Sequence, residues 1–439
     1  MIKRSSVLFV MMALVVCVTV RPRAAWGQGN TWSGASLAQV VEDARWRFGS
    51  LRANAMFELA DVGYNSDVYF GYRPGTTPDL TCYIGVPIQL LWPIGRNIVV
   101  DVFDKPQYQF FLGTPNERAL NNTFSGQVHF AFDRIYIRAG VNFDKLHQSL
   151  SRELDFYVHQ KSNELNGLVL WQASEAVSLA VLYKGARFDI GNVVYGGVNL
   201  AEALNRKENL IDFLTYVQPS SRFRFHVDGQ YGNHVFTEAR PNFRDTRTYA
   251  VFGGLDFLPN VSDRRAVAGL EGGFSLGYKR FDIIDPSFRD DSGFAGNADL
   301  SMGILKKTTG RIFFSRDFQY SVLPGATHYI SLRYGGGIMR RLTRKVSASY
   351  DLSIGFTQYP QLDTGEGGVQ PLGSNKFVNH MLGVDIQLAR DLRILFRASA
   401  ESRAVETTGL TARRGFIGLN LTYGAARRTV STPLGGLVQ

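Results

Sequence analysis

The sequence contains little cysteine, little proline and, after Val20, no long hydrophobic run. Its 439 residues include 2 Cys and 15 Pro, and 45% of them are hydrophobic. This composition excludes a disordered or collagen-like chain. No internal stretch approaches the roughly 18 apolar residues that a membrane-spanning helix needs. Cys17 lies in the amino-terminal apolar run, so Cys82 is the single cysteine expected after processing, and no internal disulfide can form.

Recognisable catalytic and cofactor motifs are missing as well. The chain has no Walker loop, no His-Glu-x-x-His and no Cys-x-x-Cys, and the Gly-x-Ser-x-Gly at Gly273–Gly277 lies within a predicted strand, without the strand-to-helix turn that a catalytic serine needs. Its histidines do not share metal-ligand spacing on any one predicted strand face. We therefore expect no catalytic residue, no metal and no cofactor, and we interpret the protein as a non-enzyme. Lysine and arginine are dispersed along the chain and form no run, which argues against nucleic acid as a partner.

Residues 1–27 have the three parts of a secretory signal peptide. These are a basic start at Lys3 and Arg4, an apolar run from Val7 to Val20, and small residues at Ala25 and Gly27. We predict cleavage before Gln28. Removing this segment lowers the formal net charge from +10 to +6, because four basic and no acidic residues lie in it.

Residues 28–50 contain a helix-like pattern. Apolar residues recur there at helical spacing, at Leu37, Val40, Val41 and Ala44. Ser36 precedes them as a candidate helix cap, and the helix is expected to run from Ser36 to Trp46. We predict that residues 28–50 form a periplasmic amino-terminal segment, either a short helix or a plug.

From Leu51 to Tyr423 the chain alternates apolar residues with polar or small ones. Between Arg134 and Phe143, the apolar positions Ile135, Ile137, Ala139, Val141 and Phe143 share one face of an extended strand. A strand with one apolar and one polar face suits a wall between lipid and water. The pattern predicts an all-β transmembrane barrel. A soluble sandwich or a propeller also has alternating strands, but no blade motif recurs in this sequence.

The breaks between these segments alternate between short turns and long polar loops. Asp133–Arg134 is a short break, and Leu146–Ser162 is a long one; a further long break is expected from Asp61 to Pro78. In bacterial barrels short turns face the periplasm, long loops face outward, and an even strand number returns both ends to the periplasm. We predict an antiparallel up-and-down β-barrel of about 18 strands over residues 51–424, followed by a tail at 425–439. The predicted strands are 51–60, 79–90, 97–104, 122–132, 134–145, 163–171, 177–189, 208–217, 222–232, 247–257, 266–280, 294–305, 310–321, 327–339, 345–357, 376–388, 392–403 and 413–423.

Polar residues at every second position define the face that should line the bore. The candidates for the lumen and the substrate path are Tyr136, Arg138, Arg224, His226, Asp228, Arg333, Arg397 and Glu401. Arginines in a narrow lumen can hold carboxylate or phosphate groups, and Tyr136 can lie against sugar rings. The alternative for each residue is an ordinary lumen charge that a neighbouring acid balances.

Several segments resemble a known family. They are Gly63–Asp67, Asn121–Asn122, Arg152–Asp155, Leu204–Arg206 and Ser315–Ser321. Together they are similar to the β-barrel porin family associated with exopolysaccharide biosynthesis and export in Gram-negative bacteria. The resemblance implies an outer-membrane pore of about eighteen strands that works beside periplasmic polysaccharide export and co-polymerase proteins.

These observations lead us to expect a channel or scaffold for exopolysaccharide export or assembly in the Gram-negative outer membrane, with a wet, weakly basic lumen. A general or small-solute diffusion porin is the alternative. A lipid- or glycan-modifying enzyme, in which Ser, His and an acid converge at one rim, is a third. The expected partners are outer-membrane lipid and lipopolysaccharide, the barrel assembly machinery, the periplasmic export proteins, and the polysaccharide or small solutes that pass.

Overall fold

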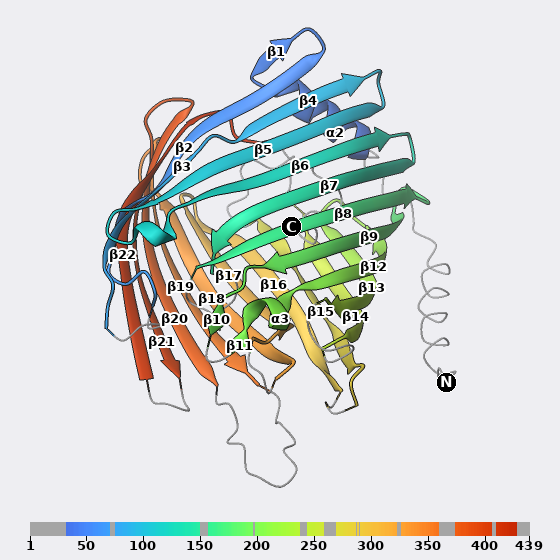
Figure 1. Cartoon of the computed structure of the whole chain (residues 1–439). Helices are drawn as coiled ribbons and strands as arrows, with labels where there is room; N and C mark the ends of the chain where they lie inside the picture. Colours follow the sequence, from blue (N-terminus) through green and yellow to red (C-terminus); the bar gives the residue numbers. More distant parts are fainter. Residues whose placement is uncertain are drawn as a thin grey trace.

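The computed structural model describes residues 32–70, 75–149, 157–195, 198–237, 244–258, 269–286, 288, 290–322, 326–359, 374–405 and 410–427. Over these residues the chain forms a closed antiparallel β-barrel of 18 wall strands, shown in Figure 1. Each wall strand pairs with its neighbours in the sequence, and the last strand pairs with the first to close the ring. Closure leaves the wall without a free sheet edge. The predicted fold class is confirmed.

The wall begins with β2 (Leu51–Asn65). The next wall strand is interrupted at Val86 and Pro87, which divides it into β3 (Asp79–Gly85) and β4 (Ile88–Ile94). The remaining wall strands are β5 (Ile98–Phe111), β6 (Ala119–Ala131), β7 (Ile135–Gln148), β8 (Val158–Gln172), β9 (Val177–Ile190), β12 (Arg206–Val217), β13 (Phe223–Phe236), β14 (Thr246–Phe257), β15 (Leu270–Ile283), β16 (Asp291–Leu305), β17 (Thr308–Tyr320), β18 (His328–Arg341), β19 (Val346–Gln358), β20 (Asn375–Gln387), β21 (Leu392–Val405) and β22 (Leu410–Gly424). Each predicted strand overlaps one of these wall strands.

A few elements lie outside the wall in the described part of the chain. They are the helix α2 (Trp32–Glu42), the short strand β1 (Trp46–Phe48), the 3-10 helix η1 (Pro115–Glu117), the hairpin of β10 (Val194–Tyr195) and β11 (Val198–Asn199), and the helix α3 (Leu200–Leu204). In Figure 1, α2 lies at the end of the barrel where the short turns of β4 to β9 are, and α3 lies toward the opposite end. The short turns mark the periplasmic end, so α3 lies toward the extracellular end.

The helix α2 differs in detail from the predicted one. It spans Trp32–Glu42, so Ser36 lies inside it, and the prediction of Ser36 as its cap is wrong. Serine costs little inside a helix, so a single serine did not fix where the helix begins. Trp46, the predicted end, begins β1 instead. None of the helices in the described ranges is long and apolar enough to span a bilayer.

The alternation of side chains places the two faces of the wall as predicted. On β7, Ile135 and Phe143 are exposed on the outer face, whereas Tyr136 between them is buried on the inner face. β-Branched and aromatic residues suit such a pleated, half-buried surface. A register slip of one residue would move every charge of a strand to the lipid side, so the pattern specifies the register strongly.

The seam between β2 and β22 contains a bulge. Their pairing shifts between Leu59 and Val62, and Asp61 there has a left-handed φ of 48°, which is uncommon outside glycine. The amide of Asp61 donates to Asn420 Oδ1 at 2.7 Å. A Cβ at Gly63 would lie 2.2 Å from the Ile417 carbonyl oxygen, so this close approach requires glycine. The strand continues past the bulge to Asn65, so the loop predicted from Asp61 begins later.

Candidate functional site: the bore and its two mouths

At the periplasmic mouth, α2 lies against the inner face of the wall. Leu37, Val40 and Val41 of α2, together with Ala44 just after the helix, form one buried cluster with inward-facing residues of β4 to β12. Those wall residues are Leu91, Val99, Ala131, Tyr136, Leu168, Leu170, Ala180, Leu182, Leu214 and Tyr216. The contact is apolar on both sides, so the hydrophobic effect holds the helix there, at about 25 cal/mol per Å² of buried apolar area. The lumen, expected to be polar, is apolar along this part of the wall.

A chain of buried polar side chains runs beside this cluster across β2, β4 and β5. Asn54 Nδ2 donates to Gln89 Oε1 at 3.2 Å, and Gln89 Nε2 donates to Asp101 Oδ1 at 3.0 Å. Asn54 Oδ1 also accepts from the amide of Arg45, just after α2, at 3.0 Å. At the other end, the guanidinium of Arg427 lies 3.9 Å from Asp101 and 4.2 Å from the centre of the Phe103 ring. The chain therefore links the segments that precede and follow the wall.

The polar ladder predicted on β13 lies on the inner face. Arg224 Nε donates to Asp256 Oδ2 at 2.9 Å, and His226 Nδ1 lies 3.5 Å from the same oxygen. Asp228 accepts a hydrogen bond from Gln230 at 2.6 Å. Arg224, His226 and Asp228 are all buried. Because buried charges need partners, Asp256 on β14 is the group that allows Arg224 to lie in this wall.

The other predicted lumen residues occupy separate parts of the bore. Tyr136 and His129 share a hydrogen bond of 2.7 Å on β7 and β6, and Arg138 follows Tyr136 on the same face. Arg333 on β18 lies over the ring of Phe313, at 5.0 Å. These groups come from strands far apart around the barrel. The structure therefore distributes the candidates along the bore and gathers no single reaction centre from them.

On β21, both predicted residues have charged partners on neighbouring strands. Arg397 pairs with Asp61 of the seam bulge at 2.8 Å, and Glu401 pairs with Arg414 at 2.6 Å. Arg397 also lies 4.8 Å from the centre of the Phe416 ring. Sequence reasoning missed Asp61, Asp256 and Arg414. Their strands are identified by the alternation, but strand register and the seam bulge decide which charges meet.

At the extracellular mouth, segments between strands turn into the bore. Leu200, Ala203 and Leu204 of α3 form a buried cluster with Tyr69, Val158, Ile190 and Val322. Of the residues that α3 meets, Tyr69 and Val322 lie in connections between strands, whereas Val158 and Ile190 lie at strand ends. Tyr69 also donates its hydroxyl hydrogen to Glu117 Oε1 at 2.8 Å. The cluster therefore places apolar side chains across part of the bore where it opens outward.

The tip of the β17–β18 hairpin joins this closure. The ladder between β16 and β17 stops at Gly296 and Arg316, although β17 and β18 stay paired as far as Tyr320 and His328. Beyond Arg316, the side chains that continue the outer face of β17 pack on the inner face of β14 and β15. Phe318 stacks on Phe281 with ring centres 6.1 Å apart, and the Tyr320 hydroxyl lies 2.6 Å from Thr246 Oγ1. The hairpin tip therefore lies inside the barrel.

Arg244 connects α3 with the hairpin tip. Its guanidinium donates to the carbonyl oxygens of Ala203 at 3.2 Å, Ser321 at 2.6 Å and Ala326 at 3.5 Å, and the side chain is buried. A buried arginine that binds main-chain carbonyls from several segments fixes their relative positions. No motif in the sequence distinguishes this arginine from the others.

No cluster of three or more His, Cys, Asp or Glu suited to a metal ion occurs in the described ranges. The bore instead offers carboxylates, guanidinium groups and aromatic rings. Such a wall binds and orients polar solutes without covalent chemistry.

Fold and bore together define a class: the chain is an outer-membrane β-barrel with a porin fold. Residues 214–423 match the family described as "Putative beta-barrel porin 2", which confirms the resemblance to that porin family over these strands. No curated protein matches the sequence.

Two solved structures match most of the chain. OccAB1 of Acinetobacter baumannii has 11% identity, a TM-score of 0.49, and coverage of 88% of this chain and 99% of that one. OprD of Pseudomonas aeruginosa has 11% identity, a TM-score of 0.48, and coverage of 88% of this chain and 98% of that one.

Proposed function

We propose that this barrel is a gated, non-enzymatic conduit for the export of an exopolysaccharide across the Gram-negative outer membrane. The observation that carries the proposal is a set of inward-facing arginines packed on aromatic rings. Arg224 lies 5.0 Å from Tyr216, Arg397 lies 4.8 Å from Phe416, and Arg403 lies 5.4 Å from Phe377, each measured to the ring centre. Guanidinium groups bind the carboxylates of acidic sugars, and aromatic rings offer flat apolar surfaces to sugar rings.

The closures at both mouths support a gated conduit over a constitutively open pore. The helix α2 covers apolar wall at the periplasmic end, and α3 and the β17–β18 tip occupy the extracellular end. A polymer could pass only if the periplasmic and the extracellular closure both moved. The energy for that movement would come from periplasmic export and co-polymerase proteins. A small-solute porin is expected to conduct ions steadily without such partners.

The test has two measurements. The purified barrel in planar bilayers should conduct little at rest. In a strain lacking the protein, surface polysaccharide should be lost and wild-type protein should restore it, whereas a variant with Arg138, Arg224, Arg333 and Arg397 replaced by glutamine should restore it poorly. A matched control replaces four exposed arginines, Arg96, Arg222, Arg344 and Arg390, by glutamine.

Both variants must keep heat-modifiable gel mobility, which reports a folded barrel. Equal restoration by the lumen variant and the wild type would contradict a role for the inner arginines. High steady conductance of the wild-type barrel, with unchanged polysaccharide in the deletion strain, would favour a small-solute porin.

A further inference from the structure

Like charges face one another on the outer surface of the barrel, near the extracellular ends of four adjacent strands. Lys145 of β7 is directly opposite Lys161 of β8, and Arg187 of β9 is directly opposite Lys207 of β12. All four side chains are exposed. Like charges opposite one another across an antiparallel pair destabilise a sheet. We call these four residues the basic patch.

The basic patch belongs to the lipid-facing side of the wall. Lys145 shares its strand face with Phe143, and Lys161 shares its face with Leu165, which is 55% exposed. The four cations lie next to the long connections, so they are at the extracellular boundary of the membrane. The strands carry exposed apolar side chains from there toward the periplasm, including Val169, Val181 and Phe213.

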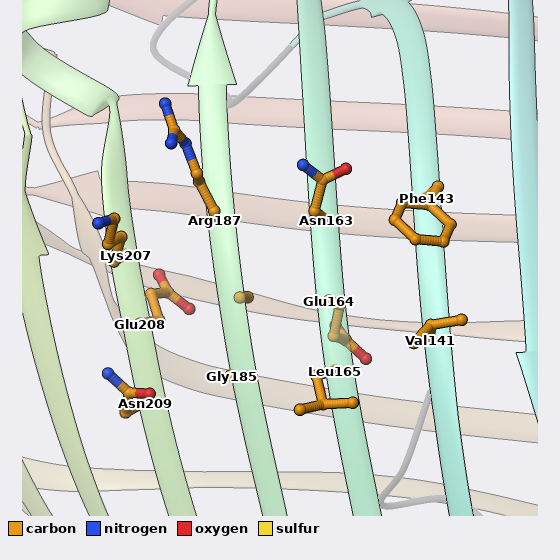
Figure 2. A pocket seen from close by; sticks show the side chains of 11 residues that line it. Val141, Phe143, Asn163, Glu164, Leu165, Gly185, Arg187, Lys207, Glu208 and Asn209 are labelled. Carbon is orange, nitrogen blue, oxygen red and sulfur yellow. The ribbon is translucent and has the colours of Figure 1, made fainter.

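A shallow hollow of about 340 Å³ lies directly beside the patch. Figure 2 shows its residues, and the strand register places them in two rows. The upper row is Phe143, Asn163, Arg187 and Lys207, and the lower row is Val141, Leu165, Gly185 and Asn209. The Tyr183 side chain lies over Gly185, where a Cβ would be 2.8 Å from the tyrosine hydroxyl oxygen, and that hydroxyl donates to Asn209 Oδ1 at 2.9 Å. The hollow thus has a polar, cationic edge and a largely apolar floor.

The protein itself does not neutralise most of this charge. Asp189 accepts from Arg187 Nε at 2.9 Å and is directly opposite Lys161 in the strand register. Among the residues that the structure describes, Lys145, Lys161 and Lys207 form no ion pair with a carboxylate. Nothing in the fold requires these lysines to face one another, since neutral polar residues would suit the same rim positions. The repulsion is therefore explained best by an anion that binds between them.

Another part of the same rim shows the opposite arrangement. On β15, Arg280 pairs with Asp282 on its own strand and lies 3.5 Å from Asp290. Arg247 of β14 is directly opposite Asp282. Basic residues there alternate with acids, so that region needs no external anion. In the basic patch, by contrast, four cations share the single acid Asp189.

We infer that the basic patch and its hollow bind a phosphorylated glycolipid of the outer leaflet. Its phosphates would lie between Lys145, Lys161, Arg187 and Lys207, where cations bind them as charged partners. Asn163 and the amide NH2 of Asn209, whose Oδ1 accepts from Tyr183, are positioned to hydrogen-bond sugar hydroxyls. An acyl chain would lie over Leu165, Tyr183 and Phe213. This site is separate from the bore, and the inference does not depend on what passes through the channel.

The experiment measures binding of bisphosphorylated lipid A to the full-length folded barrel by native mass spectrometry and by lipid-dependent thermal stability. Dephosphorylated lipid A and inorganic phosphate are the comparison ligands. The variants are K145Q/K161Q and R187Q/K207Q, and R280Q is the matched control. Each cation near a membrane surface contributes about 1 kcal/mol, so affinity should fall roughly thirtyfold in each double variant and stay unchanged in R280Q.

Without lipid, the double variants should be as stable as the wild type or more so, because the repulsion is removed. That result separates loss of a ligand site from damage to the fold; if a double variant fails to fold, K161Q alone is measured in its place. Equal affinity of wild type and variants for lipid A would overturn the inference. So would equal binding of the dephosphorylated lipid, or complete competition by millimolar inorganic phosphate, which would indicate a site for free anions.

Discussion

The two mouths of the barrel are closed by different kinds of contact. At the periplasmic mouth, α2 rests on the wall through Leu37, Val41 and other apolar side chains. At the extracellular mouth, Arg244 binds carbonyl oxygens of both α3 and the β17–β18 tip. Apolar contact has no directional requirement, whereas each of those hydrogen bonds needs an acceptor in a defined position.

This difference indicates how each closure can open. A periplasmic partner that presents an apolar surface can replace α2 on the wall while the Arg45 amide, just after the helix, keeps its hydrogen bond to the buried Asn54. Opening the extracellular mouth exposes the Arg244 guanidinium and its carbonyl partners to water or to a polar solute, which can replace their hydrogen bonds. The arrangement therefore suits release by a protein on the periplasmic side and by a hydrated polymer in the bore.

The largest expected effect is on the periplasmic side. Replacing both Leu37 and Val41 by aspartate would place two carboxylates against apolar wall. The cost is at least about 4 kcal/mol, a shift of roughly a thousandfold toward undocked α2. The extracellular cluster covers only part of the bore, so single-channel conductance to small ions should rise strongly, and hydrogen exchange of the α2 amides should become fast.

The control for this variant is D43N, because Asp43 is exposed and directly follows the same helix. Its conductance should equal that of the wild type. If the double aspartate variant also conducted like the wild type, α2 would not be a barrier, and the closure assigned to the periplasmic mouth would have to be abandoned.

A smaller effect is expected at the extracellular mouth. Replacing Arg244 by alanine removes hydrogen bonds to the carbonyls of Ala203, Ser321 and Ala326, with a loss of about 2–3 kcal/mol for bonds from a charged donor. Amides of α3 and of Ser321 should exchange faster, while α2 amides remain protected.

R280A is the matched control, because Arg280 is an exposed arginine of the same rim. Its exchange profile should be that of the wild type. Faster exchange of α2 in R244A would show that the two mouths are coupled, and the comparison between two independent closures would then fail.

The wall could be predicted from the sequence because its signals are local. Alternation over one strand and the length of the next connection each depend on a few consecutive residues, so the strand number and the faces were correct. The periplasmic closure also left a local signal that was overlooked. Leu168 to Trp171 is apolar on both faces, and such a strand has something covering its inner side.

The remaining contacts depend on residues far apart in the sequence. The hairpin tip enters the bore because the β16–β17 ladder ends early, and no residue type marks that point. Arg397 meets Asp61 only when β22 closes on β2, and the bulge there turns the carboxylate toward the bore. A strand pattern predicts that Arg397 faces the lumen, but the closed register decides its partner.

The smallest expected effect concerns that pair, which lies between the two mouths. Arg397 and Asp61 are each about one-third exposed, at 29% and 31%, so solvent screens their attraction and its contribution to stability is within about 1 kcal/mol. R397Q should therefore leave the barrel's thermal stability nearly unchanged.

Once the pore is opened by the double aspartate substitution in α2, R397Q should shift the reversal potential toward cation selectivity, because Asp61 loses its counter-charge. Adding D61N should restore the original selectivity, since the pair then contributes no net charge. If R397Q changed nothing in the opened pore, ions would pass along another part of the wall, and the β13 ladder with Arg224 and Asp256 would be the next place to measure.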